Sequence, residues 1–432
     1  ASDRSDSSPL VIAGGAAIFL NPEPVADLID LACIGEGELL VPSLLGLLRS
    51  AGGVDRERLL LSAATVSGLY VPALYEVEYD GDAVSCIRPR NGAPPCVQRG
   101  ICSDLNFAAT GSQLFTPGTE FSDMYLLEVS RGCPRGCRFC AAGFIYEPYR
   151  QRSLESVKDQ AAEALAKHGK IGLVGAAVGD FKGIGELCRF IRNAGGNVSV
   201  ASLRIDSLDD EMVRVLAESG HKTVSLAPEG SSQRIRDMIR KGVSTGQILD
   251  ACRRVISHDI LNLKLYFIIG FPTETSDDLE EMVSLVKSIR MLVTETAKGN
   301  RRLGQITLSV NPFVPKPFTP FQWCGMTKVK ELEAKTAFLR KAFAGMPNVR
   351  LLMEGIRESL TQALVSRGDR RLSGVIVRAA ETDGLRKALK EENMDLQQIV
   401  TRSIPLDEKL PWDVICCENR ERLETEYRKA FE

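Results

Sequence analysis

The sequence predicts an α/β fold: a partial (β/α)6 barrel, preceded by a truncated Rossmann-like domain and followed by a mostly helical C-terminal region. From Tyr125 onward, short apolar runs alternate with longer helical segments about six times, which is typical of parallel β/α units. Nearer the N-terminus, two further apolar runs each precede a helix-like segment, which favours a smaller parallel sheet. We therefore expect four segments in chain order: 1–65 as the partial Rossmann-like domain, 66–120 as a β-hairpin and connector, 121–327 as the barrel, and 328–432 as the helical region.

The composition of the chain is that of an ordinary globular protein. Hydrophobic residues make up 44% of the 432 residues, and 54 basic side chains nearly balance 56 acidic ones. This balance gives no argument for a nucleic-acid partner. No run approaches the roughly 18 apolar residues of a membrane span, and the first residues are polar rather than typical of a secretory signal. We expect a cytoplasmic protein with no membrane partner.

The first segment has the pattern of half a doubly wound domain. Val11–Ala13 is expected to form a short strand, and Val25–Leu31 a helix after a proline-rich turn. Cys33–Ile34 is expected to form a second strand, followed by a helix over Leu39–Leu48. Only about half of a complete Rossmann domain fits into this length.

The second segment contains a predicted hairpin. Tyr75–Tyr79 alternates in polarity, Asp80–Asp82 has the composition of a tight turn, and Val84–Ile87 is the expected return strand. Glycine, proline and asparagine residues between positions 91 and 119 then indicate a long connector.

The barrel is expected to contain six strands and six helices in alternation. The predicted strands are Tyr125–Val129, Ile171–Val174, Asn197–Ser202, Thr223–Leu226, Leu263–Ile269 and Gln305–Val310. The predicted helices are Leu154–His168, Ile184–Asn193, Asp209–Ser219, Ser232–Ile239, Gly246–His258 and Ser276–Met291.

The most informative motif is a cluster of three of the twelve cysteines. Cys133, Cys137 and Cys140 have the spacing C-x3-C-x2-C on a loop just after the first barrel strand. Closely spaced thiolates favour an iron–sulfur cluster or zinc. Structural zinc usually requires four ligands, and no second C-x2-C pair or neighbouring histidine follows. Three ligands instead leave one iron of a 4Fe-4S cluster open to S-adenosylmethionine (SAM).

This motif resembles that of the radical SAM superfamily, and the resemblance spans about residues 125–325. It implies that the cluster, reduced by a protein such as flavodoxin or ferredoxin, breaks the sulfonium C–S bond of SAM to give a 5′-deoxyadenosyl radical. It also implies a set of cofactor-binding residues. These are Phe139, Ile268 and Gly270 near the adenine, Gly179 and Asp180 where the family usually has a Gly-Gly-Glu segment for the SAM amino group, and Ser202, Arg204 and Glu229 as ribose or carboxylate contacts. For Arg204 and Glu229, an ordinary ion pair at the barrel rim is the alternative interpretation.

The chain is similar, more narrowly, to cobalamin-binding-type radical SAM proteins. The resemblance is carried by Gly14–Gly15, Asn21–Pro24 and Ile34–Glu38 in the first segment, by Ala227–Arg236, and by Asn311–Trp323. It implies cobalamin as a third cofactor and methyl transfer as a candidate reaction. The Asp-x-His-x-x-Gly segment of members that bind cobalamin through a histidine is absent, because the three histidines are His168, His221 and His258. Cobalamin binding without a histidine and a remnant domain without cobalamin both remain open.

Three alternatives accompany this interpretation. A methylthiotransferase acting on RNA or protein would need a second cluster, for which Cys86, Cys96 and Cys102 are the candidates, although single cysteines are more often buried packing residues. A cysteine near the C-terminus, Cys416 or Cys417, is a candidate hydrogen donor. A non-enzymatic iron–sulfur or zinc module is the third alternative.

Overall fold

The computed structural model describes the chain except for residues 1–3, 6, 52–54, 117, 120, 202, 301 and 383. The chain divides into two compact units. The barrel unit comprises residues 104–313 and 329–356, and the terminal unit comprises residues 1–103, 314–328 and 357–432. These units differ from the four expected segments, because parts of all four, including residues 314–327 of the third, pack together in the terminal unit.

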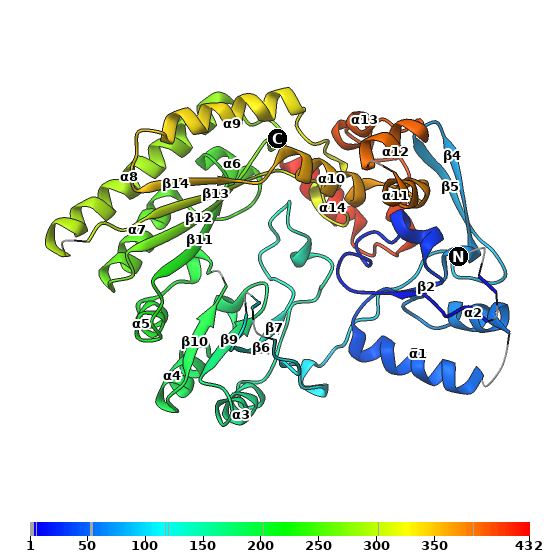
Figure 1. Cartoon of the computed structure of the whole chain (residues 1–432), viewed down its shortest axis with the longest axis horizontal. Coiled ribbons are helices and arrows are strands. Elements are labelled where there is room, and N and C mark those ends of the chain that lie inside the picture. The colour runs from blue at the N-terminus through cyan, green and yellow to red at the C-terminus, as the bar shows by residue number, and fades with distance from the viewer. Residues whose placement is uncertain are drawn as a thin grey trace. The chain divides into compact units, whose positions relative to one another are not determined.

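The barrel unit is built on two parallel sheets, drawn in green to gold in Figure 1. Their strand orders are β10-β9-β6 and β11-β12-β13-β14, and a parallel bridge between Leu203 and Leu226 connects them. The strands are β6 (Tyr125–Glu128), β9 (Lys170–Val174), β10 (Asn197–Val200), β11 (Thr223–Glu229), β12 (Asn262–Ile269), β13 (Ile306–Pro312) and β14 (Val349–Met353). The six predicted strands are confirmed, and the partial barrel with them.

Strand β14 is an element that was not expected within the mostly helical region after residue 327. It pairs in parallel with β13, so it extends the barrel sheet by one strand. The sequence signal was weak because the strand is short and lies at the sheet edge. Arg350 and Leu352 are exposed, whereas Val349, Leu351 and Met353 pack against the core.

Helices follow the barrel strands as expected. They are α3 (Leu154–Leu165), α4 (Ile184–Asn193), α5 (Asp210–Glu218), α6 (Gln233–Met238), α7 (Thr245–Ser257), α8 (Ser276–Asn300) and α9 (Val329–Phe343). Polar residues fix several starts: the side chain of Ser153 accepts a hydrogen bond from the first turn of α3, and that of Asp209 does the same for α5. Ser244 and Gln247 form a reciprocal capping box at α7.

The hydrophobic core of the barrel unit lies between the sheets and these helices. In β12, Leu263, Leu265, Phe267 and Ile269 are buried in this core. Burying each such side chain stabilises the fold by roughly 1.5–3 kcal/mol. Alternate residues of the same strand point to the other face, where Lys264, Tyr266 and Ile268 are only half-buried. In β12, the inner face therefore carries polar as well as apolar side chains.

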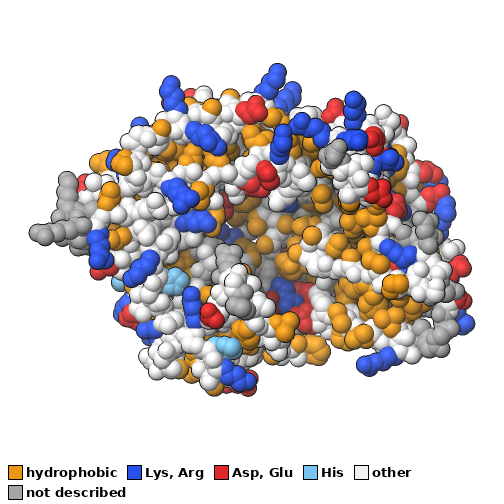
Figure 2. All heavy atoms as spheres, in the orientation of Figure 1, with side chains coloured by type: hydrophobic (Ala, Val, Ile, Leu, Met, Phe, Trp, Pro, Cys, Tyr) orange, Lys and Arg blue, Asp and Glu red, His pale blue; other side chains and the backbone are white. Residues whose placement is uncertain are grey.

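The terminal unit begins with a small sheet of order β1-β2-β3. Strand β1 (Ile12–Ala13) pairs in parallel with β2 (Leu31–Cys33), as expected, but β3 (Leu69–Tyr70) is antiparallel to β2. The predicted helix over Val25–Leu31 is instead a 3-10 helix, Glu23–Leu28, that starts at a proline-rich turn. Helices α1 (Gly37–Ala51) and α2 (Arg56–Ala64) follow. Figure 2 shows hydrophobic side chains gathered over the region of α1, where Val41 and Leu45 are exposed.

The rest of the terminal unit consists of the predicted hairpin and a helical region. The hairpin strands are β4 (Tyr75–Asp80) and β5 (Ala83–Pro89). The helices are α10 (Ile356–Arg367), α11 (Leu372–Glu381), α12 (Leu385–Glu391), α13 (Leu396–Thr401) and α14 (Arg420–Lys429). Arg370 ties the two ends of the sequence together, because its guanidinium contacts the buried carboxylate of Glu23 at 3.1 and 3.2 Å and the Tyr70 hydroxyl at 2.8 Å. Within the described residues, no helix is both long and apolar enough to cross a bilayer.

Candidate functional site

The three clustered cysteines lie on a loop at the carboxyl end of the first barrel strand. Two short antiparallel strands, β7 (Ser130–Arg131) and β8 (Arg150–Gln151), pair at the base of this loop and hold its ends together. Gly132 has φ +84°, and a Cβ at this position would lie 2.8 Å from the Tyr146 carbonyl oxygen. The tight entry into the loop therefore requires glycine at position 132.

All three cysteines are free thiols, with Cys137 buried and the other two half-buried. The pKa of the Cys140 thiol is raised to about 11, first by burial and then by the charges of Cys137 and Cys133. Burial also raises the pKa of Cys133, and the Cys137 charge adds to this effect. The charge of Cys137 therefore raises the pKa values of both other thiols.

This donor set fits a 4Fe-4S cluster held by three thiolates. Each cysteine of such a cluster ligates a different iron, so the sulfurs do not have to surround one point. Among the residues that the structure describes, no three His, Cys, Asp or Glu side chains are grouped around a position for a single metal ion. Positive charge is also available, because one guanidinium nitrogen of Arg204 lies 4.0 Å from Cys137 Sγ.

Arg204 belongs to a network of arginines and carboxylates beside the cysteines. Its guanidinium donates to both carboxylate oxygens of Asp206, at 3.0 and 3.1 Å. Arg135, from the cysteine loop itself, pairs with Asp206 at 3.0 Å and also with Asp180. The network links the cysteine loop to the ends of β9 and β10. Arg204 thus forms the ion pair that the alternative interpretation predicted for it at the barrel rim. Its guanidinium also lies next to Cys137.

Glu229 has a different partner from Arg204. Its carboxylate lies 3.6 Å from the ammonium of Lys241, and burial raises its pKa. The residue has φ +65°, at the end of β11 where the pairing register with β12 shifts. The charge of Glu229 also contributes to the raised pKa of the Cys140 thiol.

The residues predicted near the adenine lie on two neighbouring elements. Phe139 packs edge-on against Phe271, with ring centroids 5.6 Å apart, and Phe271 packs in turn against Phe313. Ile268 is half-buried on the inner face of β12, and Gly270 follows the strand with φ +76°. The structure therefore brings Phe139 close to the end of β12.

The remaining predicted residues differ in how clearly the structure places them. Gly179 lies in a 3-10 turn (Val178–Asp180), where a Cβ would lie 2.3 Å from Ser207 Oγ, so a larger residue would require Ser207 to move. Asp180 follows directly, and Arg135 Nε donates to its carboxylate at 3.1 Å. Ser202 lies outside the described residues.

Sequence reasoning missed Glu274 as a separate functional residue. Its fully buried carboxylate accepts hydrogen bonds from the Gly270 N–H at 2.6 Å, the Ser231 hydroxyl at 2.9 Å and the Lys335 ammonium at 3.2 Å. It therefore holds the end of β12 in place. The only signal in the sequence was its position four residues after Gly270.

The other candidate cysteines lie in the terminal unit. Cys96 and Cys416 form a disulfide, so neither offers a free thiol in this structure. Cys102 is buried, and its backbone N–H donates to Glu36 at 2.8 Å. Cys86 is half-buried in the hairpin, and Cys417 is half-buried beside the disulfide. The structure does not support a second cluster on Cys86, Cys96 and Cys102, or Cys416 as a hydrogen donor.

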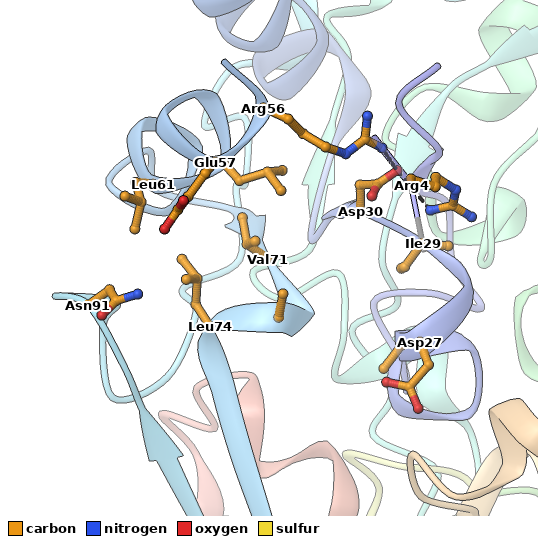
Figure 3. A pocket seen from close by; sticks show the side chains of 13 residues that line it. Arg4, Asp27, Ile29, Asp30, Arg56, Glu57, Leu61, Val71, Leu74 and Asn91 are labelled. Carbon is orange, nitrogen blue, oxygen red and sulfur yellow. Dashed lines mark hydrogen bonds and ion pairs between the residues drawn. The ribbon is translucent and has the colours of Figure 1, made fainter. Parts of the chain in front are cut away.

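The terminal unit also contains a cavity of about 610 Å³, shown in Figure 3. Apolar side chains such as Leu61, Val71 and Leu74 line one part of it. At its other end, Arg4 and Arg56 both contact Asp30, at 2.9 and 2.7 Å. The two arginines are thus already neutralised in part by Asp30.

Comparison with known proteins identifies the family. The model of the radical SAM superfamily matches residues 127–286, and a model of radical SAM proteins described as N-terminal matches residues 1–72. Residues 127–286 of the chain therefore contain a radical SAM domain. The family match covers the cysteine loop and the strands up to β12.

The chain is also similar to individual proteins. The uncharacterized protein MJ0966 of Methanocaldococcus jannaschii is 29% identical over 400 residues, which cover 90% of this chain and 78% of that protein. The ribosomal protein uS12 methylthiotransferase RimO of Acetivibrio thermocellus is 28% identical over 177 residues, which cover 37% of this chain and 38% of RimO. The cobalamin-dependent SAM radical enzyme OxsB with aqua-cobalamin bound aligns over 98% of this chain and 67% of OxsB, at 13% identity and a TM-score of 0.46.

As a radical SAM enzyme, the protein has a defined set of family cofactors. The family implies a 4Fe-4S cluster, SAM and an external reductant. The three free thiols on the loop after β6 are the residues that fit the cluster.

Proposed function

We propose that this radical SAM enzyme cleaves SAM reductively at a 4Fe-4S cluster on Cys133, Cys137 and Cys140, and then abstracts a hydrogen atom from an unidentified substrate. The observation that carries the proposal is the placement of three free thiols on one loop at the carboxyl ends of parallel strands, with Arg204 beside them. When bound, the cluster supplies the electron that breaks the sulfonium C–S bond of SAM.

The protein's own residues orient the cofactors and exclude water. Arg204 provides positive charge next to the thiolate of Cys137. Phe139 and Phe271 form an apolar contact at the end of β12, which suits the adenine of SAM. Ile268 and Gly270 present strand-end backbone at the same place. A flavodoxin or ferredoxin would deliver the electron.

Cobalamin-dependent methyl transfer is a second candidate. It is supported by the parallel pair of β1 and β2, which is the start of the expected Rossmann-like arrangement. The sequence has only three histidines, and all of them lie in the barrel unit. The terminal unit therefore does not fit cobalamin binding through a histidine of its own. We assign no step to this cofactor.

Methylthiotransferase activity has less support from the residues. Relatives such as RimO carry that name, but the match to RimO covers only 38% of its length. The disulfide of Cys96 leaves no free trio of cysteines in the connector for a second cluster.

Anaerobic reconstitution tests the proposal. With dithionite and SAM, the enzyme should be brown, should contain about four iron atoms per chain, and should release 5′-deoxyadenosine. Cys137→Ser should lose the iron and the product, whereas Cys86→Ser, a cysteine in the hairpin, should keep both. Bound corrinoid and S-adenosylhomocysteine, measured in the same samples after adding hydroxocobalamin, test the methyl-transfer candidate.

A colourless protein that retains zinc would contradict the proposal. A protein with a complete cluster that releases no 5′-deoxyadenosine from SAM and dithionite, with or without hydroxocobalamin, would also contradict it.

A further inference from the structure

The ribbon of β7 and β8 presents three polar side chains on one face, next to the cysteine loop. Ser130 lies directly opposite Gln151 in this antiparallel pair. Tyr149 precedes Gln151 by two residues, which places it on the same side of an extended chain. A Cβ at Gly132 would lie 3.4 Å from the Tyr149 Cα, so Tyr149 is adjacent to the start of the loop.

Two of these three side chains have a buried hydroxyl without a hydrogen-bond partner. Ser130 is 1% exposed, and neither its Oγ nor the Tyr149 hydroxyl has a partner of acceptable geometry. A buried hydroxyl without a partner costs free energy, so such groups in native proteins usually face a bound ligand or water. Two of them side by side therefore indicate a ligand.

The surroundings of Tyr149 show which ligand is near. A Cβ at Gly175, directly after β9, would lie 2.8 Å from Ser130 Oγ. Tyr149 is adjacent to Gly132, at the start of the cysteine loop. The two residues therefore lie between the cysteine loop and the turn that follows β9, where we place SAM.

The other polar groups in this region are already engaged. The Asp180 carboxylate, which the family resemblance would assign to the SAM amino group, pairs with Arg135. The Gln151 amide donates to the Asp180 carbonyl oxygen at 3.2 Å, and its oxygen accepts from the Lys182 N–H at 2.9 Å. These contacts fix the turn after β9 and leave the two hydroxyls as acceptors.

We propose that the hydroxyls of Tyr149 and Ser130 accept hydrogen bonds from the amino group of bound SAM, in place of the Asp180 carboxylate. This inference rests on the proposed function, since it needs SAM at the cluster. A hydroxyl oxygen has two lone pairs, so each group can accept from an N–H of SAM. Tyr149 and Ser130 are thus positioning residues for SAM.

The test measures SAM binding directly on the full chain with a reconstituted cluster. Equilibrium dialysis with radiolabelled SAM gives Kd, and electron paramagnetic resonance of the dithionite-reduced cluster reports whether SAM changes its signal. Tyr149→Phe and Ser130→Ala should each raise the Kd about tenfold, while iron content and the spectrum without SAM stay unchanged. Tyr79→Phe is the matched control, because it removes another buried hydroxyl that lacks a partner, in the terminal unit.

Several results would overturn the inference. Wild-type SAM affinity in both Tyr149→Phe and Ser130→Ala would show that neither hydroxyl binds SAM. A loss of affinity confined to Asp180→Asn would assign the amino group to that carboxylate. If Tyr149→Phe fails to hold iron, the Kd of Ser130→Ala for SAM tests the inference instead, since this substitution removes only one small buried group. A wild-type protein that holds its cluster but binds no SAM would instead refute the proposed function.

Discussion

At the scale of single residues, the Glu274–Lys335 pair has the clearest energetic role. The carboxylate is fully buried and the ammonium nearly so, and the Lys335 ammonium also donates to the Glu274 backbone carbonyl at 3.0 Å. Burial raises the pKa of Glu274, and Lys335 opposes this effect. Because Glu274 also accepts from the Gly270 N–H, the pair links α9 to the end of β12, where we place the adenine of SAM.

Removing one partner of this pair should be costly. Lys335→Met leaves a buried carboxylate without its counter-charge, so we expect the free energy of unfolding to fall by about 3–5 kcal/mol. The double variant Glu274→Gln, Lys335→Met should recover part of the loss, because it removes the unpaired charge. Urea unfolding checks both values. A single variant within about 0.5 kcal/mol of wild type would show that water replaces the ammonium.

Residue-scale prediction from sequence succeeded where spacing alone carries the information. The three cysteines fall within eight positions, so any loop conformation keeps their sulfurs in one region. The sequence did not predict the ion pair of Asp180 with Arg135. The two residues are 45 positions apart, and their pairing depends on how the strands align. The orphaned hydroxyls of Ser130 and Tyr149 had no sequence signal at all.

At the scale of elements, the disulfide is the main connection within the terminal unit that no pattern indicated. Cys96 and Cys416 are 320 residues apart in sequence. Around them, the Val97 N–H donates to the Val414 carbonyl at 2.8 Å and the Cys416 N–H donates to the Val97 carbonyl at 3.0 Å. The bond therefore fastens the connector segment to the C-terminal segment.

Breaking this bond should weaken the terminal unit. Cys96→Ser should lower the free energy of unfolding by about 2–4 kcal/mol, because the cross-link restricts a very long loop in the unfolded chain. Cys86→Ser in the hairpin is the control and should change little. Alkylation under denaturing conditions should label ten of the twelve cysteines of the cluster-free protein before reduction and all twelve afterwards. Complete labelling without reductant would contradict the bond.

Prediction of the elements was best for the long, strongly periodic ones. Helix α4 (Ile184–Asn193) has the expected bounds, and the six expected barrel strands are present. It was weakest for short elements such as β3 and β14. A strand of two to five residues carries too few alternations to be distinguished from a loop, and its partner strand decides whether it forms.

At the scale of the whole molecule, the cluster should act as a ligand that stabilises the folded chain. Two short strands, β7 and β8, close the base of the cysteine loop, and Arg138 donates from the loop to the carbonyls of Ile239 and Met238. A group that binds the folded loop and not the unfolded chain raises stability by mass action. Cluster binding should therefore stabilise the folded conformation of the loop after β6.

Reconstitution should raise the unfolding temperature of the barrel unit by about 5 °C. Differential scanning calorimetry under anaerobic conditions, with and without the cluster, measures this shift. The variant with all three loop cysteines replaced by serine should show no shift in the same comparison. An equal unfolding temperature for the loaded and the cluster-free wild type would contradict the expected coupling.

The sequence by itself determined the cysteine loop, the succession of parallel strands and helices, and with them the radical SAM family. These features are local: ligand spacing and hydrophobic periodicity are properties of neighbouring residues, and the chain keeps them wherever it folds. Tertiary structure alone decided that Arg135 forms an ion pair with Asp180, that Cys96 forms a disulfide with Cys416 and that Lys335 forms an ion pair with Glu274. It also left the hydroxyls of Ser130 and Tyr149 without hydrogen-bond partners next to the cysteine loop. Each of these depends on groups brought together from distant positions, and only the packed fold sets those distances.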